Sequence, residues 1–577
     1  MILIMALIDM LGVASIVPFI AILSNPEIIE SNFFLNEAFK KGSIIGIDTQ
    51  DEFLIATGIA VFLLLIFSLT FKALTMYSQT RFSEMCKYNI SKRLLGYYLY
   101  QPYSWFLNRN SATLSKTILS EVSHVIGKGL SPMISLITSI IITITLFILL
   151  VFVDLKLTIT AILIMSIFYV IVYTFNKNLV SKIGKEIFKA NAQRFKILNE
   201  AFGGSKELKM GGFEQTYLDQ FAKPAHRIAR HSALTEIITQ IPRFSLEAIA
   251  FGGMILIILY LMTLGRSLNN VLPLIALYAF AGYRLLPTIQ KIYIATTYLR
   301  IVGPALDSLH DDLRKLKPDI QDKNQDKNKE VLDLRKSIIL KDVNYRYPNS
   351  EKTALKNINL IIPANSTIGL IGKTGSGKTT TIDIILGLLV AHKGTLEVDE
   401  KTINKNNIRS WQRSIGYVPQ HIFLTDNTVA ANIALGVNIK DIDHEAVEHA
   451  AKIANVHDFI INELPLKYNS PIGERGIRLS GGQRQRIGIA RALYHKPKVL
   501  VLDEATSALD SLTEKAVMEA VHNSKNKITK ILVAHRLSTV RKCDKIFLLE
   551  KGELKAQGTF EELIEISDEF RQSVKEL

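Results

Sequence analysis

A glycine-rich octapeptide is the strongest chemical signal in this 577-residue sequence. It reads Gly372-Lys373-Thr374-Gly375-Ser376-Gly377-Lys378-Thr379, follows an apolar segment and opens a helical pattern at Thr380. Glycines let the backbone wrap closely around phosphates, while N–H groups at a helix N-terminus face their negative charge. We expect Lys378 to reach the β and γ phosphates of a nucleotide and the Thr379 hydroxyl to bind Mg²⁺.

A short apolar segment that ends in two acids is the second signal. It reads Val499-Leu500-Val501-Leu502-Asp503-Glu504. The pattern predicts a buried strand that places Asp503 beside the metal and Glu504 where a general base would polarise the attacking water. Many buried strands end in acids, so this signal is weak alone. Combined with the glycine loop, it predicts ATP hydrolysis.

A third motif, Leu479-Ser480-Gly481-Gly482-Gln483, precedes a helical pattern from Arg484 to Tyr494. Small residues before a helix make another N-terminus suited to an anion. A chain that already holds one phosphate site has little use for a second one alone, so we expect this motif to close on ATP bound to another copy. The plainer interpretation is a helix start with a flexible glycine cap.

Three single residues stand in order around these motifs. Tyr347 is predicted to stack on adenine, Gln420 to reach the metal and sense the γ phosphate, and His535 to contact the γ phosphate. Taken singly, they are more simply a core tyrosine, a surface glutamine and a satisfied histidine.

The pattern of apolar and polar residues divides the chain into a membrane part, a polar linker and an α/β part that contains these motifs. Apolar runs of about 20 residues suit bilayer-spanning helices. After residue 313 comes a polar linker (314–336), and then short β-branched runs alternate with helical patterns (337–577), which predicts a mainly parallel sheet covered by helices. The six predicted spans within 1–313 are Met1–Leu23 (interrupted by Asp9 and Pro18), Phe53–Ser78, Leu130–Val153, Leu155–Phe175, Pro242–Leu264 and Val271–Leu299. Only Asp154 and its neighbours separate the third span from the fourth, which predicts a tight helical hairpin.

Charge orients these spans. The formal net charge is +15, and most of the excess lies among the apolar runs. Because the loop 25–52 is acidic and the loops 81–128 and 177–196 are basic, the positive-inside rule places the basic loops and both termini in the cytoplasm. The basic loops are expected to extend the helices and to contain short transverse helices near 108–110 and 211–212. The placement of the positive charge favours membrane topology over binding to nucleic acid or to anionic headgroups, so we expect no nucleic-acid partner. The two cysteines form neither a metal-ligand nor a disulfide pattern.

Over nearly its whole length the sequence resembles the ATP-binding cassette (ABC) family. The motifs that carry the resemblance are Walker A (372–379), Q-loop (Gln420), signature (479–483), Walker B (499–503), Glu504, D-loop (507–510), H-loop (His535) and an exporter-type X-loop (473–476). The resemblance implies a six-helix exporter bundle followed by an α/β P-loop ATPase domain with a helical subdomain. It also implies head-to-tail dimers with two ATP molecules between Walker A of one copy and the signature of the other, and coupling helices in the cytoplasmic loops. The intact Glu504 and signature favour a homodimer. The sequence departs from the family pattern in one respect: such exporters usually have a cytoplasmic elbow helix before the first span, and this sequence begins at the first predicted span.

The membrane half is similar to bacterial lipid-linked oligosaccharide flippases of the PglK type, through residues 242–247 and 283–287. This likeness implies the bacterial inner membrane.

Charged residues inside the predicted spans indicate the cargo, because such residues usually face a cavity or a partner. Lys72, Arg243 and Arg284 against Glu247 predict a positive chamber for a phosphate or pyrophosphate headgroup. Alternatively, Arg243 pairs with Glu247 one helical turn away and Lys72 snorkels to the interface. The chain is therefore predicted to flip an anionic lipid-linked oligosaccharide or related lipid. Export of peptides, toxins or drugs is the alternative. A soluble DNA-maintenance ATPase is a remote one, disfavoured by six spans and the lack of a long coiled-coil insert.

Overall fold

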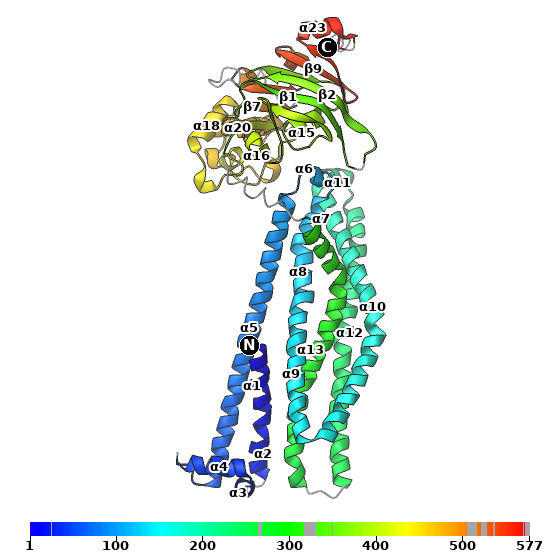
Figure 1. The fold of residues 1–577 in the computed structure, drawn as a ribbon, viewed down its shortest axis with the longest axis vertical. Helices are drawn as coiled ribbons and strands as arrows, with labels where there is room; N and C mark the ends of the chain where they lie inside the picture. The colour runs from blue at the N-terminus through cyan, green and yellow to red at the C-terminus, as the bar shows by residue number, and fades with distance from the viewer. Residues whose placement is uncertain are drawn as a thin grey trace. The chain divides into compact units, whose positions relative to one another are not determined.

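The structure, a computed structural model, divides the chain into two compact units, each treated by itself below (Figure 1). One unit comprises Met1–Leu99 and Arg109–Lys317, and the other comprises Tyr100–Asn108 and Pro318–Leu577. The described residues are 1–24, 26–44, 46–263, 268–316, 330–348, 350–504, 516–520, 528–534, 537–568 and 570–571. His535 and the D-loop, together with most of the predicted linker, lie outside them.

Over its described residues the first unit consists of helices joined by short turns, and its long helices run side by side (Figure 1). Within it, α9 packs along α13, α10 along α12 and α13, and α5 along α1. Its elements are α1 (Ile2–Ala14), α2 (Ile16–Ser24), α3 (Ile28–Ser31), α4 (Phe33–Ser43), α5 (Gln50–Leu99), α7 (Ser111–Lys116), the π-helix η1 (Thr117–Glu121), α8 (Val122–Val125), the π-helix η2 (Ile126–Leu130), α9 (Ser131–Val153), α10 (Leu155–Gly203), α11 (Ser205–Gly211), α12 (Glu214–Thr263) and α13 (Leu268–Lys315).

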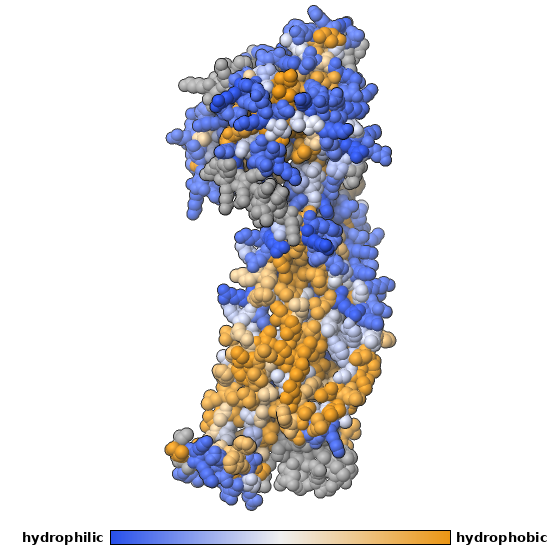
Figure 2. Space-filling model, viewed as in Figure 1, coloured by the Kyte–Doolittle hydropathy of each residue, from blue (hydrophilic) through white to orange (hydrophobic). Residues whose placement is uncertain are grey.

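Helical segments cover all six predicted spans, apart from Met1 and Ser15 in the first span and Leu264, the last residue of the fifth, which is not described. In the described part of the chain, four segments are long and apolar enough to cross a membrane: Ile2–Leu23, Gln50–Leu99, Ser111–Val153 and Thr158–Gly203. Apolar side chains cover much of the outer surface of this unit (Figure 2), as expected where lipid tails replace water. The 50 residues of α5 extend about 75 Å, far more than the hydrocarbon core requires.

The breaks between the helices have local causes. The first span breaks at Ser15, whose hydroxyl donates to the Gly12 carbonyl at 2.9 Å. Asp9 lies inside α1, and Pro18 falls in the first turn of α2, where a missing N–H costs nothing. Asp154 alone separates α9 from α10, which confirms the predicted hairpin. The short α11 ends at Gly212, which has a left-handed φ of 63°.

The second unit is an α/β domain built on two sheets. The six-stranded sheet has the order β10-β9-β3-β8-β7-β6 and is parallel except for β10; the four-stranded sheet, β2-β1-β4-β5, is antiparallel. The strands are β1 (Ser337–Arg346), β2 (Thr353–Pro363), β3 (Thr367–Ile371), β4 (Lys393–Val398), β5 (Lys401–Thr402), β6 (Ile415–Val418), β7 (Val499–Asp503), β8 (Thr529–Val533), β9 (Lys545–Glu550) and β10 (Glu553–Gly558).

Helices cover these sheets, and a helical segment lies between β6 and β7. They are α6 (Tyr103–Phe106), α15 (Lys378–Ile385), α16 (Ile408–Gln412), α17 (Val429–Ile433), α18 (His444–Ile453), α19 (His457–Glu463), α20 (Gly481–Tyr494), α22 (Leu537–Val540), α23 (Phe560–Ile566) and the 3₁₀ turns η3 (Ile439–Asp441), η4 (Lys467–Asn469) and η5 (Glu474–Gly476).

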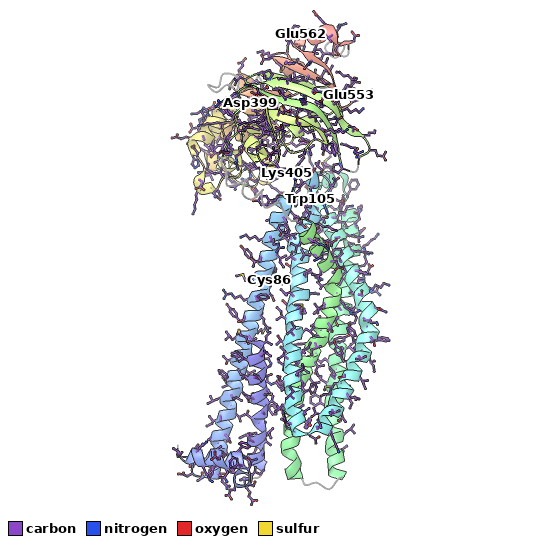
Figure 3. The ribbon with its side chains drawn as sticks, in the orientation of Figure 1. Cys86, Trp105, Asp399, Lys405, Glu553 and Glu562 are labelled. Atoms are coloured by element: carbon purple, nitrogen blue, oxygen red, sulfur yellow. The ribbon has the colours of Figure 1, made fainter. Side chains whose placement is uncertain are left out.

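Asp399 and Trp105 of this unit, both labelled in Figure 3, contact residues near them. The Asp399 carboxylate accepts hydrogen bonds of 2.7–3.0 Å from the backbone N–H groups of Arg335, Lys336 and Ser337, which fixes the chain where it enters β1. On α6, the Trp105 ring packs edge-on against Phe106 at 5.1 Å. In the other unit, Cys86 lies on α5, and both it and the buried Cys543 are free thiols.

Candidate functional site

The glycine loop, Gln420 and Glu504 follow the carboxyl ends of parallel strands in one sheet. The strands β3, β8, β7 and β6 lie consecutively in the sheet, with Leu370 and Asp503 both in register with Val533. After β3 comes the glycine loop, after β7 Glu504, and shortly after β6 Gln420. In parallel α/β sheets this edge is where ligands bind, so the topology brings these residues to one place.

The glycine loop has a backbone that side chains would not tolerate. Gly372 has φ 149°, and a Cβ there would lie 2.2 Å from the Leu549 carbonyl oxygen. Gly377 has φ 103°, and a Cβ would lie 2.8 Å from Leu355. Gly375 has φ 79° with open space beside it. The loop therefore needs glycine for close packing at two positions and for conformation at all three.

The polar groups of the loop suit an anionic ligand. The Lys378 ammonium donates to the loop's own carbonyls, at 2.6 Å to Gly372 and 3.1 Å to Lys373. The Ser376 hydroxyl is buried with no hydrogen-bond partner among the described residues. An unsatisfied buried donor is costly, and a phosphate oxygen would satisfy it. The loop therefore fits the phosphate groups of a nucleoside triphosphate.

The charge balance around Lys378 fits the same role. Burial lowers the pKa of the Lys378 ammonium, and the carboxylates of Glu504 and Asp503 oppose this shift. Asp503 is buried, at 6% exposure, at the end of β7. Thr379 is exposed in the first turn of α15. A carboxylate and a hydroxyl, together with the phosphate oxygens of a bound nucleotide, would suit a hard divalent cation.

Glu504 and Gln420 are in direct contact. The Gln420 side-chain amide donates to the Glu504 carboxylate, Nε2 to Oε2, at 2.6 Å. Glu504 has a left-handed φ of 50°, and its N–H donates to the Val533 carbonyl at 3.1 Å. The left-handed backbone of Glu504 directs its side chain away from the line of β7. The hydrogen bond from its N–H holds the Glu504 backbone beside β8.

Tyr347 and Thr380 form a pair that the sequence did not predict. Tyr347 follows β1, and its hydroxyl lies 3.0 Å from the Thr380 hydroxyl on α15. With His392 it also lines an open cleft of about 520 Å³. The bond anchors one edge of the Tyr347 ring to the helix that follows the glycine loop.

The signature motif has its own cap. Ser480 accepts from the Gln483 N–H at 3.2 Å, and the Gln483 side chain accepts from the Ser480 N–H at 2.7 Å, which together form a capping box at the start of α20. Ser480 is exposed, and Gly481 and Gly482 are half-buried. The helix start is thus rigid while its N-terminal face stays accessible.

A second site lies within the helical unit, where a cavity of about 970 Å³ brings together all three predicted substrate residues. Lys72 comes from α5, Arg243 from α12 and Arg284 from α13. Lys291, two helical turns after Arg284, also lines the cavity and was not predicted, although its spacing places it on the same helix face.

Both arginines of the cavity have acidic partners. Arg243 Nε lies 2.8 Å from Glu247 Oε1, as the alternative interpretation predicted, and both residues also line the cavity. Arg284 Nη1 lies 3.0 Å from Asp9 Oδ1, a partner that the sequence did not indicate. Lys72 lines the cavity together with the arginines.

Comparison with known proteins agrees with this architecture. Residues 355–507 match the family described as ABC transporter, and residues 31–285 match the ABC transporter transmembrane region. The chain is 30% identical over 512 residues to the heterocyst differentiation ATP-binding protein HepA of Nostoc sp., which covers 87% of this chain and 82% of that protein. It is also 30% identical over 482 residues to the ATP-dependent lipid A-core flippase of Wigglesworthia glossinidia brevipalpis, which covers 83% and 81%.

A solved structure, that of a bacterial Atm1-family ABC exporter with ATP bound, superposes with a TM-score of 0.81 at 20% identity, covering 100% of this chain and 98% of that one. The predicted fold class, an exporter-type transmembrane bundle joined to an α/β ATPase domain, is thereby confirmed. The chain belongs to the ABC transporter family and is a membrane exporter whose ATPase domain binds ATP and couples its hydrolysis to transport.

Proposed function

We propose that this exporter flips an anionic lipid, such as a lipid-linked oligosaccharide, across the bacterial inner membrane. The observation that carries the proposal is the 970 Å³ cavity, in which Lys72, Arg243 and Arg284 converge from three different helices. Among the described residues that line it, Lys291 brings the number of cations to four, against one acid, Glu247. Cations at membrane depth are costly unless a counter-charge meets them, and a phosphate-bearing headgroup is such a counter-charge.

The rest of the lining suits the other end of a lipid. Apolar and aromatic side chains share the cavity with the cations, among them Met5, Ile142, Leu246, Phe251 and Phe280. An amphipathic cargo needs both surfaces. Two relatives named ATP-dependent lipid A-core flippase, from Wigglesworthia glossinidia brevipalpis and Saccharophagus degradans, support a lipid cargo.

In the ATPase domain, we assign roles by position. Lys378 and the loop from Gly372 to Thr380, including Lys373 and Thr374, would hold the phosphates, and Tyr347 the adenine. Thr379, Gln420 and Asp503 would hold Mg²⁺, which neutralises developing charge. Glu504 would accept a proton from the attacking water. His535, outside the described residues, is proposed to contact the γ phosphate.

The capped but accessible start of α20 supports a dimeric mechanism. Ser480, Gly481, Gly482 and Gln483 would contact ATP held by a second copy of the chain, so we propose a homodimer with two equal sites. The proposal keeps the domain limits predicted from the sequence (1–313, 314–336, 337–577), with the ATPase domain in the cytoplasm.

Reconstitution tests the cargo. The full chain in liposomes is assayed for ATPase activity with a polyprenyl phosphate, the matched uncharged polyprenol, phospholipids, and hydrophobic peptides. Stimulation by the phosphate lipid, and not by the polyprenol, is expected. Stimulation by peptides alone would replace the lipid with a peptide cargo.

A further inference from the structure

We propose that Asp9 is a specificity-determining residue of the cavity, acting as an internal counter-ion with which an anionic headgroup must compete for Arg284. The inference rests on the proposed function, because it assumes that the headgroup reaching Arg284 is an anion.

Asp9 is the single charged residue of α1, and its side chain is 3% exposed. An isolated carboxylate in an apolar helix is expensive to bury. Within the described part of the chain, its carboxylate forms an ion pair with Arg284 on α13 and a hydrogen bond with Ser68 on α5.

Those partners satisfy only one side of the carboxylate. Asp9 Oδ1 lies 3.0 Å from Arg284 Nη1 and accepts from the Ser68 hydroxyl at 3.3 Å. The other oxygen, Oδ2, is buried without a hydrogen-bond partner among the described residues. An arginine and a carboxylate that pair for stability commonly use both oxygens in a two-pronged arrangement. The single-pronged contact here leaves Arg284 with donors to spare.

The spare donors belong to a residue that reaches the cavity. Arg284 is 15% exposed and lines the cavity, whereas Asp9 is not among the lining residues. Arg284 therefore lies between a buried carboxylate and the space where cargo would bind. A headgroup can approach Arg284 from the cavity without first removing Asp9, and it then competes with Asp9 for the guanidinium.

The other charges of the cavity make this competition selective. Glu247 already pairs with Arg243, in a contact whose side chains are 54% and 36% exposed. Lys72 and Lys291 have no ion-pair partner within the described part of the chain. A phosphate or pyrophosphate can form ion pairs with these two lysines, and their energy offsets the weakening of the Asp9–Arg284 pair. A neutral headgroup cannot form such ion pairs. Asp9 thus excludes neutral cargo and weakens anion binding enough to allow release.

The test uses the full chain in liposomes, with ATPase activity measured against increasing amounts of polyprenyl phosphate and of matched polyprenol. For Asp9→Asn, we expect the half-maximal phosphate-lipid concentration to fall by about tenfold, because a unit charge close to the headgroup has been removed from a low-dielectric site. Glu247→Gln removes the same charge from a more exposed pair and is expected to give a smaller shift. An unchanged or higher half-maximal concentration for Asp9→Asn would overturn the proposal, and equal shifts in both variants would reduce it to an effect of net charge.

A second variant guards against loss of folding in the first. Ser68→Ala keeps every charge but removes the donor that shares Asp9 Oδ1, so Asp9 should hold Arg284 more tightly and the half-maximal concentration should rise by about threefold. A fall, or no change, contradicts the counter-ion role. If the wild-type chain itself ignores polyprenyl phosphate, the proposed function fails. If the wild type responds and neither variant shifts, only the role of Asp9 fails.

Discussion

Gln420 holds Glu504 by a 2.6 Å hydrogen bond that joins the ends of the adjacent strands β6 and β7. The same glutamine was expected to reach the metal, and the same glutamate to polarise water. Because the amide nitrogen of Gln420 makes this bond, its carbonyl oxygen can still coordinate a metal. A metal held by Gln420 would therefore also fix the position of the Glu504 carboxylate, and in this way Gln420 would connect the proposed metal site to the proposed base.

Replacement of Glu504 by Gln should separate binding from turnover. We expect ATP to bind normally while hydrolysis falls by about 10²- to 10⁴-fold, the usual contribution of a general base, so that closed dimers accumulate. Nucleotide binding, ATPase rate and size-exclusion chromatography measure the three effects. Glu445→Gln, at the exposed start of α18, is the control. Near-normal hydrolysis in Glu504→Gln would remove Glu504 from its assigned role.

Gly184→Ala should destabilise the helical unit. A Cβ at Gly184 on α10 would lie 2.5 Å from the Ile301 carbonyl oxygen on α13, so the two helices would have to move apart. Such overpacking typically costs about 1–3 kcal/mol. Gly303→Ala, where a Cβ meets nothing within 4 Å, is the matched control and should be neutral or slightly stabilising. Thermal unfolding in detergent compares them, and equal melting temperatures for the two variants would contradict the close approach.

The pH dependence of stability should include a contribution from Asp383. Burial, with the charge of Asp503 adding to it, raises the pKa of the Asp383 carboxyl to about 6 from 3.8. The folded state therefore binds this proton more tightly than the unfolded state. The resulting stability is fully present below the unfolded pKa and is lost as pH rises toward about 6.

Asp383→Asn removes this dependence. At about pH 8 the variant should be more stable than the wild type by about 2 kcal/mol, and the difference should shrink toward pH 5. Thermal unfolding of the full chain at both pH values tests this, with the exposed Asp441→Asn as control. A difference that grows on acidification would refute the assignment.

Arg284→Ala should abolish the increment in ATPase activity caused by polyprenyl phosphate. Arg284 contributes a cation to the cavity, and its loss also leaves Asp9 buried without an ionic partner. Arg93→Ala, on the part of α5 beyond the predicted second span, removes an equal charge away from the cavity and should keep the increment. Unchanged stimulation in Arg284→Ala would argue against the cationic chamber.

Local patterns were enough to predict the glycine loop and the buried strand of the candidate ATPase site. The glycine loop depends on φ values and close packing that only glycine allows at Gly372 and Gly377, so it appears directly in the sequence. The strand that ends at Asp503 is buried along its whole length and is equally visible as an apolar run. The tight hairpin at Asp154 followed from two apolar runs with one acid between them.

Contacts between distant segments could not be predicted in the same way. The Asp9–Arg284 pair depends on how α1 and α13 are rotated about their axes, which packing determines and which apolar runs do not record. Asp9 was interpreted only as an interruption of the first span. The Tyr347–Thr380 bond likewise requires β1 and α15 to lie at a given distance, and no local pattern encodes it.

Tyr100–Asn108 belong to the ATPase unit, although the chain on both sides of them belongs to the helical unit. The chain therefore crosses between the units three times, after Leu99, after Asn108 and after Lys317. A protease that cuts only between residues 317 and 329 would therefore leave both pieces attached through the segment that carries α6. To release the ATPase unit, the same enzyme would also have to cleave on each side of that segment or unfold the unit that holds it.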